Sequence, residues 1–314
     1  MNAFPTMTSR IDGYLAKRRQ EGFALWMTGL HLMGFARFAD QSGHQGHLTT
    51  ELAIRWATAQ PKPNPLNSAY RMGIVRQFAL HWQLIEPATE IPPARLLGYP
   101  RRRLTPHIYT DEELRDLLVA AAAMPPTGSL RAKTCAAVFG LLASTGLRVS
   151  EAIGLSRADV DLAKGLLHIR HAKFGKDRWV PLHPTTCHAL RLYGRRSDQD
   201  RTSANADAFF VFDKGQPITY RKLLCAFSRL RRQLHWRSRG GFRVPRIHDI
   251  RHTFVCRRLE HWSQDGLDVD ANILALSTYI GHVHVTKTYW YVTATPELLA
   301  IAAQRFEHNT GDLS

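Results

Sequence analysis

A proline-rich segment after the first quarter of the chain divides the sequence into two parts. Four prolines and Gly98 interrupt the run ATEIPPARLLGYPRRRLTPHIYTDEEL, residues 88–114, so a continuous helix cannot cross it. The chain has 314 residues, which is also more than one typical hydrophobic core serves. We therefore predict a first domain at residues 1–98, an extended linker at 99–109 and a second domain at 110–314.

Apolar spacing predicts that both parts are mainly helical. Across residues 8–85, apolar side chains recur every three to four positions, which is the period of helices that pack on a core. In the second part, Thr110 and Glu113 have the spacing of a capping box, so a helix should begin at Asp111. The next helical run should end at Gly146, since glycine readily adopts the left-handed backbone found after helix ends.

Two short segments interrupt the helical pattern of the second part. LLHIR, residues 166–170, and RWVPL, residues 178–182, are joined by the polar turn AKFGKD and read as an antiparallel strand pair. Pro181 has no N–H to donate, so its strand should lie at an edge. The fold class expected is mainly α with a small antiparallel sheet, giving a helical first domain and a mixed α/β second domain.

The chain carries a large excess of positive charge. It has 42 Lys and Arg against 26 Asp and Glu, a net charge of +16, so a polyanion such as nucleic acid is the expected partner. Residues 221–246 contain nine Lys and Arg and no acid, which is typical of a phosphate-contacting surface or of a solvated basic face. The DNA-binding residues predicted from the linker, the hairpin turn and this segment are Arg101, Arg102, Arg103, Lys176, Arg221, Lys222 and Arg243.

Other features argue against several classes of protein. The four cysteines are widely spaced without a CxxC pair, so neither a disulfide framework nor a zinc site is expected. His248 and His252 have a metal-ligand spacing, but no HExxH pattern or nearby cysteine accompanies them, and no metal is predicted. The apolar run at 24–36 is too short to span a bilayer, and the first residues lack the apolar core of a signal peptide. We expect no membrane association and a cytoplasmic, nucleoid-associated protein.

Four residues in three segments are candidates for chemistry. Arg148 lies in a turn before a helix that Ser150 is expected to cap, where helix N–H groups favour an anion. Taken alone, this position favours a surface arginine that could pair with Glu151. His248 and Arg251 are three residues apart and should share a helix face. Lys173 in the hairpin turn could be a solvent-exposed lysine, could reach a DNA edge or could protonate a leaving oxygen.

The segment YIGHVHVTKTYWYV, residues 279–292, raises the question of which tyrosine reacts. In one uninterrupted helix, Tyr289 lies seven residues after His282 and shares its face, whereas Tyr291 points roughly opposite. Helical periodicity alone therefore favours Tyr289 as the partner of His282.

The order of these motifs resembles the tyrosine recombinase (phage integrase) family. TGLRVSEAIGL, a hairpin that ends in RWVPL, HDIRHTF, YIGH and then Tyr291 nine residues after His282 follow one another over residues 106–306. The helical first part is similar to the core-binding domain of that family in type and position. The resemblance implies a core-binding and a catalytic domain that close around a duplex as a C-shaped clamp.

The resemblance also implies a role for each candidate. Arg148 and Arg251 would clamp the scissile phosphate, and Lys173 would protonate the leaving 5′-oxygen. His248 would assist proton transfer, and His282 would bind the phosphate. Tyr291 would be the nucleophile because a new helix begins near Thr286, and Tyr289 would pack in the core. Lys176 is a second candidate for the lysine role, because Phe174 stands where a small residue is common.

The implied activity is site-specific strand exchange through a 3′-phosphotyrosyl intermediate, as in integration, excision or transposition of a mobile element. It would need no cofactor. The partners would be double-stranded DNA and three further copies of the chain, with a C-terminal helix at residues 295–307 exchanged between subunits. A silent DNA-binding regulator of the same fold, a type IB topoisomerase and a telomere resolvase are the alternatives.

Overall fold

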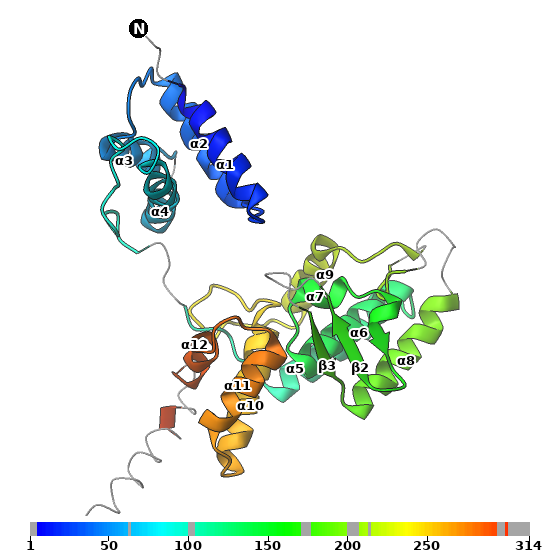
Figure 1. The fold of residues 1–314 in the computed structure, drawn as a ribbon. Coiled ribbons are helices and arrows are strands. Elements are labelled where there is room, and N and C mark those ends of the chain that lie inside the picture. The colour runs from blue at the N-terminus through cyan, green and yellow to red at the C-terminus, as the bar shows by residue number, and fades with distance from the viewer. Residues whose placement is uncertain are drawn as a thin grey trace, which may run out of the picture. The chain divides into compact units, whose positions relative to one another are not determined.

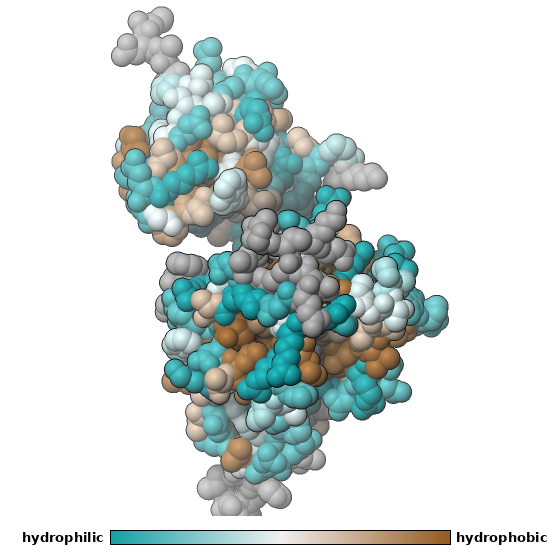
Figure 2. Space-filling view, turned by 90° about the vertical axis from the view of Figure 1, so that its right-hand side faces the viewer, coloured by the Kyte–Doolittle hydropathy of each residue, from teal (hydrophilic) through white to brown (hydrophobic). Residues whose placement is uncertain are grey.

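The computed structural model describes residues 5–61, 64–99, 104–170, 177–199, 207–212, 215–293 and 299–300. The chain divides into two compact units, Met1–Arg103 and Leu104–Ser314 (Figure 1). Within the described residues, no helix is both long and apolar enough to cross a membrane. The face of each unit seen in Figure 2 carries many hydrophilic residues, with smaller groups of hydrophobic ones between them.

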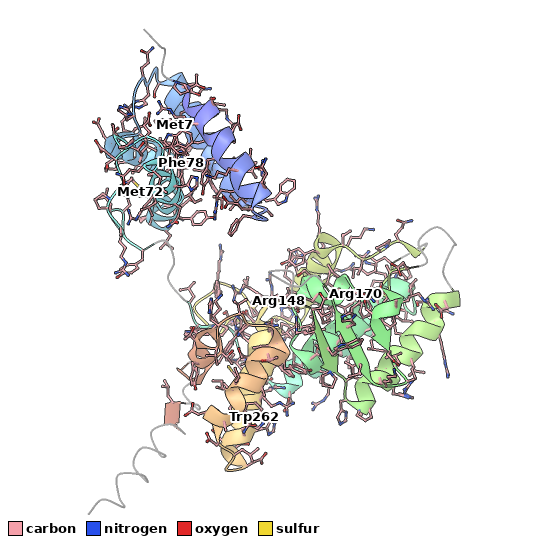
Figure 3. The ribbon with its side chains drawn as sticks, viewed as in Figure 1. Met7, Met72, Phe78, Arg148, Arg170 and Trp262 are labelled. Atoms are coloured by element: carbon pink, nitrogen blue, oxygen red, sulfur yellow. The ribbon has the colours of Figure 1, made fainter. Side chains whose placement is uncertain are left out.

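The described part of the first unit contains four helices, and the apolar spacing predicts a helical domain here. The helices are α1 (Met7–Gln20), α2 (Trp26–Gln41), α3 (Thr50–Thr58) and α4 (Pro65–Trp82). The side chains of Thr6, Thr49 and Asn64 accept hydrogen bonds from backbone N–H groups at the starts of α1, α3 and α4. Met7, Met72 and Phe78 lie in the shared core of these helices (Figure 3).

The second unit is mainly helical and contains one small sheet. Its α-helices are α5 (Asp111–Ala122), α6 (Leu130–Thr145), α7 (Val149–Ile153), α8 (Pro184–Gln199), α9 (Tyr220–Gln233), α10 (Asp249–Gln264), α11 (Val269–Ile280) and α12 (Thr286–Tyr289). Short 3-10 turns η1 (Arg157–Asp159) and η4 (Trp290–Thr293) complete the described helical elements. The predicted capping box of Thr110 and Glu113 is present, and α6 ends at left-handed Gly146 as expected.

The sheet has three antiparallel strands in the order β1–β2–β3. Strands β2 (Leu166–Ile169) and β3 (Arg178–Pro181) pair with Leu166 opposite Pro181 and Ile169 opposite Arg178. Pro181 thus lies in an edge strand, which confirms its prediction. Strand β1 (Val160–Asp161) was not predicted, because two residues are too few to show an alternating pattern.

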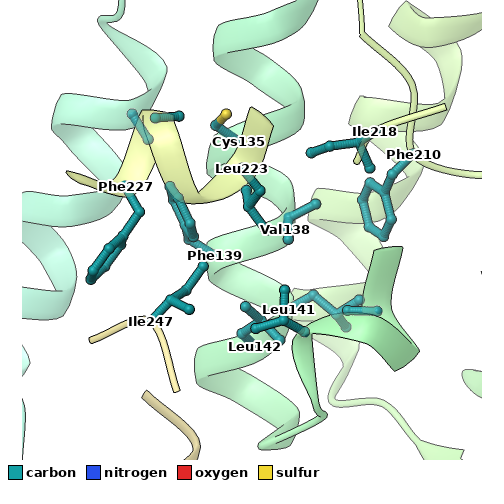
Figure 4. Close-up of a cluster of buried hydrophobic side chains, with 14 of the residues drawn as sticks. Cys135, Val138, Phe139, Leu141, Leu142, Phe210, Ile218, Leu223, Phe227 and Ile247 are labelled. Atoms are coloured by element: carbon teal, nitrogen blue, oxygen red, sulfur yellow. The ribbon is translucent and has the colours of Figure 1, made fainter. Parts of the chain in front are cut away.

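Helix α6 runs through the main core of the second unit. Its Val138 and Phe139 pack among side chains of the neighbouring segments, including Phe210 and Phe227 (Figure 4). A smaller cluster joins α10 and α11 and includes Tyr291. Residues 104–109, the second half of the predicted linker, belong to this unit: Tyr109 N–H donates to Thr253 Oγ1 on α10 at 2.9 Å.

Candidate active site

Three arginines from separate parts of the chain meet at the C-terminal end of α11. Arg178 Nε donates to the Tyr279 carbonyl at 2.9 Å, Arg251 Nη2 to Ile280 at 2.7 Å and Arg148 Nη2 to Gly281 at 2.8 Å. The last carbonyls of a helix lack intrahelical partners and carry the negative end of the helix dipole. The end of α11 therefore favours the assembly of three guanidinium groups that would otherwise repel one another.

Arg148 reaches this point because it caps α7. The expected cap, Ser150, is wrong: α7 begins at Val149, and Arg148 is the N-cap residue. The reason is Glu151, whose Oε2 accepts the Arg148 backbone N–H at 2.9 Å and whose Oε1 binds Arg148 Nη1 at 2.6 Å. The short connection from Gly146 then directs the Arg148 side chain toward α11.

Glu151 binds a second arginine that was not among the predicted site residues. Arg178 Nη1 and Nη2 donate to its two oxygens at 3.1 and 2.9 Å. Burial alone would raise the pKa of Glu151, but the hydrogen bonds from Arg178 and from the Arg148 backbone lower it to about 2. A carboxylate that stays ionised thus links Arg148 to the first residue of β3.

Arg251 lies in the first turn of α10 and is 3% exposed. Its Nη1 donates to the Gly146 carbonyl at 2.7 Å, so it joins the end of α6 to the end of α11. Burial and the charge of Arg148 lower the pKa of Arg251 to about 10, while Tyr291 opposes this shift. The site thus brings Arg148, Arg251 and Tyr291 within electrostatic range of one another.

His248 is the N-cap residue of α10 and keeps contact with solvent. Crowding by the surrounding protein and the positive charges of Arg251 and Arg246 lower the pKa of His248 to about 4. Its ring lies 4.9 Å from that of His252, which in turn lies 5.3 Å from that of Tyr291. The sequence interpretation considered His252 only as a metal ligand and missed its position beside the tyrosine.

The two tyrosines near the end of α12 have opposite environments. Tyr291 is 3% exposed, and its ring is nearly parallel to that of His282 at 6.3 Å; Tyr289 is 41% exposed. The predicted core position of Tyr289 is therefore wrong. A helix does begin at Thr286, as expected, and the 3-10 turn after it directs Tyr291 inward. A hydrogen bond with Asp270 raises the pKa of Tyr289, which disfavours its phenolate.

His282 follows the αL residue Gly281 directly. Its Nδ1 lies 2.9 Å from the hydroxyl oxygen of Thr288, which is fully buried. This contact fixes the ring of His282 beside Tyr291. The structure therefore brings together five of the six predicted catalytic residues, and the sixth, Lys173, lies outside the described residues together with its alternative, Lys176.

Three of the predicted DNA-binding residues are described by the structure, and all three are exposed. Arg221 and Lys222 are exposed on α9, and Arg243 is exposed in the loop before α10. Arg101, Arg102 and Arg103 lie outside the described residues.

Part of the basic segment 221–246 has a structural role. Arg239 pairs with Glu113, and Arg246 pairs with Asp249 at 2.6 Å. Acids from outside the segment neutralise these two arginines, which reduces the area of the expected basic surface. A composition count within one segment could not show these partners. In the described part of the chain, no three potential metal-ligating side chains cluster.

Comparisons with known proteins identify relatives of this chain. The model of the phage integrase family matches residues 108–297. The protein y4rB of Sinorhizobium fredii (strain NBRC 101917 / NGR234), assigned in name to the integrases and recombinases, is 38% identical over 311 residues, 98% of this chain and 99% of y4rB. A Tn1549 transposon integrase solved with transposon end DNA matches 97% of this chain and 99% of its own, with a TM-score of 0.68 and 16% identity.

A third similarity is to a lambda integrase tetramer bound to a Holliday junction. It covers 92% of this chain and 78% of that chain, with a TM-score of 0.63 and 15% identity. The two structural matches share the fold of the mainly helical chain with its small sheet. The family match and the full-length relative establish more: the chain belongs to the phage integrase family, the tyrosine recombinases, which are enzymes of site-specific DNA recombination.

Proposed function

We propose that this protein cleaves and rejoins DNA strands through a 3′-phosphotyrosyl bond to Tyr291. The single observation that carries the proposal is the juxtaposition of Arg148, Arg251 and buried Tyr291. Arg251 interacts electrostatically with both other residues, and the two guanidinium groups bind neighbouring carbonyls. Negative charge accumulates on the phosphoryl oxygens in the transition state of phosphodiester cleavage. Two fixed guanidinium groups stabilise that charge.

In the proposed reaction, the Tyr291 oxygen bonds to phosphorus and the bond to the 5′-oxygen breaks. The phenol loses its proton, and the 5′-oxygen gains one to leave as a hydroxyl. His248 is neutral at pH 7 because its pKa is about 4, so it adds no further positive charge beside the arginines. The negative charge of a bound phosphate would raise this pKa and make the ring a better proton acceptor. Lys173, or Lys176, would supply the proton to the leaving oxygen. The 5′-hydroxyl of another strand then bonds to phosphorus, the bond to Tyr291 breaks and the phenol regains a proton. No energy source is needed because each step replaces one phosphate ester by another.

Double-stranded DNA at a recombination site is the proposed substrate. Exposed Arg221, Lys222 and Arg243, with Arg101–Arg103 of the linker, would contact its phosphates. Four copies would act together, as in the lambda integrase tetramer, with residues 295–307 exchanged between subunits, and the two domains would close around the duplex. The proposed context is integration, excision or transposition of a mobile element in the cytoplasm.

The test uses duplex DNA that carries the sequences flanking the gene in its host. Wild-type protein should form a covalent adduct that survives denaturant, and added EDTA should not reduce it. Tyr291→Phe should lose the adduct while it still binds DNA, and Tyr289→Phe should keep it.

Each other outcome points elsewhere. Loss of the adduct in Tyr289→Phe alone would make Tyr289 the nucleophile, and loss with EDTA would refute the metal-independent mechanism. Specific binding without any adduct would favour a silent regulator. Relaxation of supercoils without exchange between sites would favour a topoisomerase.

A further inference from the structure

We infer that Arg178 is a positioning residue for DNA cleavage, acting through Glu151 on Arg148 and through Tyr279 on the end of α11. The inference rests on the proposed function of this site. Arg178 is 11% exposed at its side chain, and its three nitrogens are all directed at groups of the protein. It is the first residue of β3 and approaches the site from the side of the sheet.

Arg178 determines how much of the Arg148 charge is available to DNA. Glu151 is 6% exposed and ionised, and it binds Nη1 of Arg148. Without a second cation, this carboxylate would neutralise Arg148 and hold it as a closed ion pair. Because Arg178 binds both oxygens of Glu151, the cluster of two arginines and one acid keeps a net positive charge for a phosphate.

Arg178 also fixes the segment that carries His282. Its bond to the Tyr279 carbonyl is the first of the three arginine contacts along residues 279–281. Its guanidinium packs so closely on Gly281 that a Cβ there would lie 2.7 Å from Nη1. The position of Gly281 in turn sets the direction of the next residue, His282. The Arg178 side chain therefore fixes the position of Arg148 relative to the segment that carries His282.

Lysine cannot reproduce this geometry. A guanidinium binds a carboxylate with two parallel N–H groups and still offers Nε to a third acceptor, whereas an ammonium is a point charge. Arg178→Lys should therefore keep the charge but lose part of the alignment, and Arg178→Gln should lose both.

The experiment measures single-turnover formation of the Tyr291 adduct at saturating DNA, with DNA affinity and thermal unfolding measured in parallel. Displacement of reacting groups by about 1 Å typically costs on the order of 100-fold in rate. We expect Arg178→Gln to slow adduct formation about 100-fold and Arg178→Lys about 10-fold, with the DNA Kd within about threefold of wild type. Arg170→Gln is the matched control, because Arg170 follows β2, is 48% exposed and pairs with Asp159 instead of Glu151 (Figure 3).

A double-mutant cycle separates positioning from general loss of structure. If Arg178 acts through Arg148, the rate effects of Arg148→Lys and Arg178→Gln should be far less than multiplicative when combined. Multiplicative effects, or a wild-type rate in folded Arg178→Lys, would overturn the inference. If Arg178→Gln does not fold, Arg178→Lys alone decides. Failure of the proposed function has a different signature, since wild-type protein and Arg170→Gln would then form no adduct at Tyr291 either.

Discussion

Arg148 and Arg251 bind the carbonyl oxygens of adjacent residues, Gly281 and Ile280, with bonds of 2.8 and 2.7 Å. The two arginines come from the cap of α7 and the first turn of α10, so neither segment could bring them together by itself. The end of α11 acts as the common acceptor. A phosphate that entered this site would meet two guanidinium groups whose orientation is already set, which lowers the cost of ordering them during the reaction.

Replacement of Arg251 by lysine should separate its catalytic and structural roles. Lysine cannot reach Gly146 and Ile280 together, so one buried carbonyl should lose its partner at a cost of about 1–3 kcal/mol. Adduct formation by the folded fraction should fall at least about 100-fold. Single-turnover cleavage and urea unfolding measure the two effects.

The matched control for that change is Arg257→Lys on the same helix. Arg257 donates to the Tyr109 carbonyl at 2.8 Å and is 27% exposed, and the contacts of its guanidinium with Tyr109 and Asp111 lie away from the arginine cluster. It should lose stability without losing cleavage by the folded fraction. Equal rate losses in the two variants would show that Arg251 acts only through the fold.

Glu151 should make the stability of the second unit depend on acid pH. Its folded pKa of about 2 lies below the ordinary 4.5, so its contribution is complete above pH 4.5 and is lost as the pH falls toward 2. The size of the shift corresponds to about 3 kcal/mol. The advantage of wild type over Glu151→Gln in free energy of unfolding should therefore shrink as the pH is lowered from 5 to 3. A constant difference across that range would contradict this reading of the ion pairs.

His248 should titrate below the ordinary histidine value of 6.5 in the protein without DNA. Crowding and the charges of Arg251 and Arg246 favour the neutral ring. Since the folded pKa is lowered, the histidine contributes stability above pH 6.5, and that contribution is lost as the pH falls through about 4. NMR titration of the ring protons measures the midpoint. A bound phosphate adds negative charge, so DNA should raise this midpoint, and an unchanged value would argue that the phosphate lies elsewhere.

The sequence predicted the local features well because their causes are local. The capping box at Thr110, the left-handed end of α6 at Gly146 and the edge strand with Pro181 each depend on a few neighbouring residues. Arg178 could not be identified in this way. Its role depends on Glu151 and Tyr279, which lie in other segments, and an arginine directly after the polar turn AKFGKD looks like a solvent-exposed residue.

Local patterns in the sequence also could not show which of the two tyrosines, Tyr289 or Tyr291, is buried. Periodicity in one continuous helix favours Tyr289, and the resemblance placed Tyr289 in the core once Tyr291 was assigned as nucleophile. The structure has Tyr291 buried and Tyr289 exposed, because α12 ends at Tyr289 and the following 3-10 turn changes the direction of the side chains. A change of helix type over four residues leaves no clear signal in apolar spacing.

Two glycines with nearly the same backbone offer a test of how closely Arg178 packs on the end of α11. Gly281 and Gly266 have φ of 69° and 70°, so alanine at either position should cost about 1–2 kcal/mol in backbone strain. They differ in their surroundings: a Cβ at Gly281 would lie 2.7 Å from Arg178 Nη1, whereas a Cβ at Gly266 would enter open space beyond its own chain neighbours. Gly281→Ala should therefore displace Arg178 and slow adduct formation about 100-fold, while Gly266→Ala should lose only stability. Cleavage normalised to the folded fraction and urea unfolding of both variants measure this difference. If the two alanine variants cleave DNA equally fast, the contact between Arg178 and Gly281 does not control the alignment of the site.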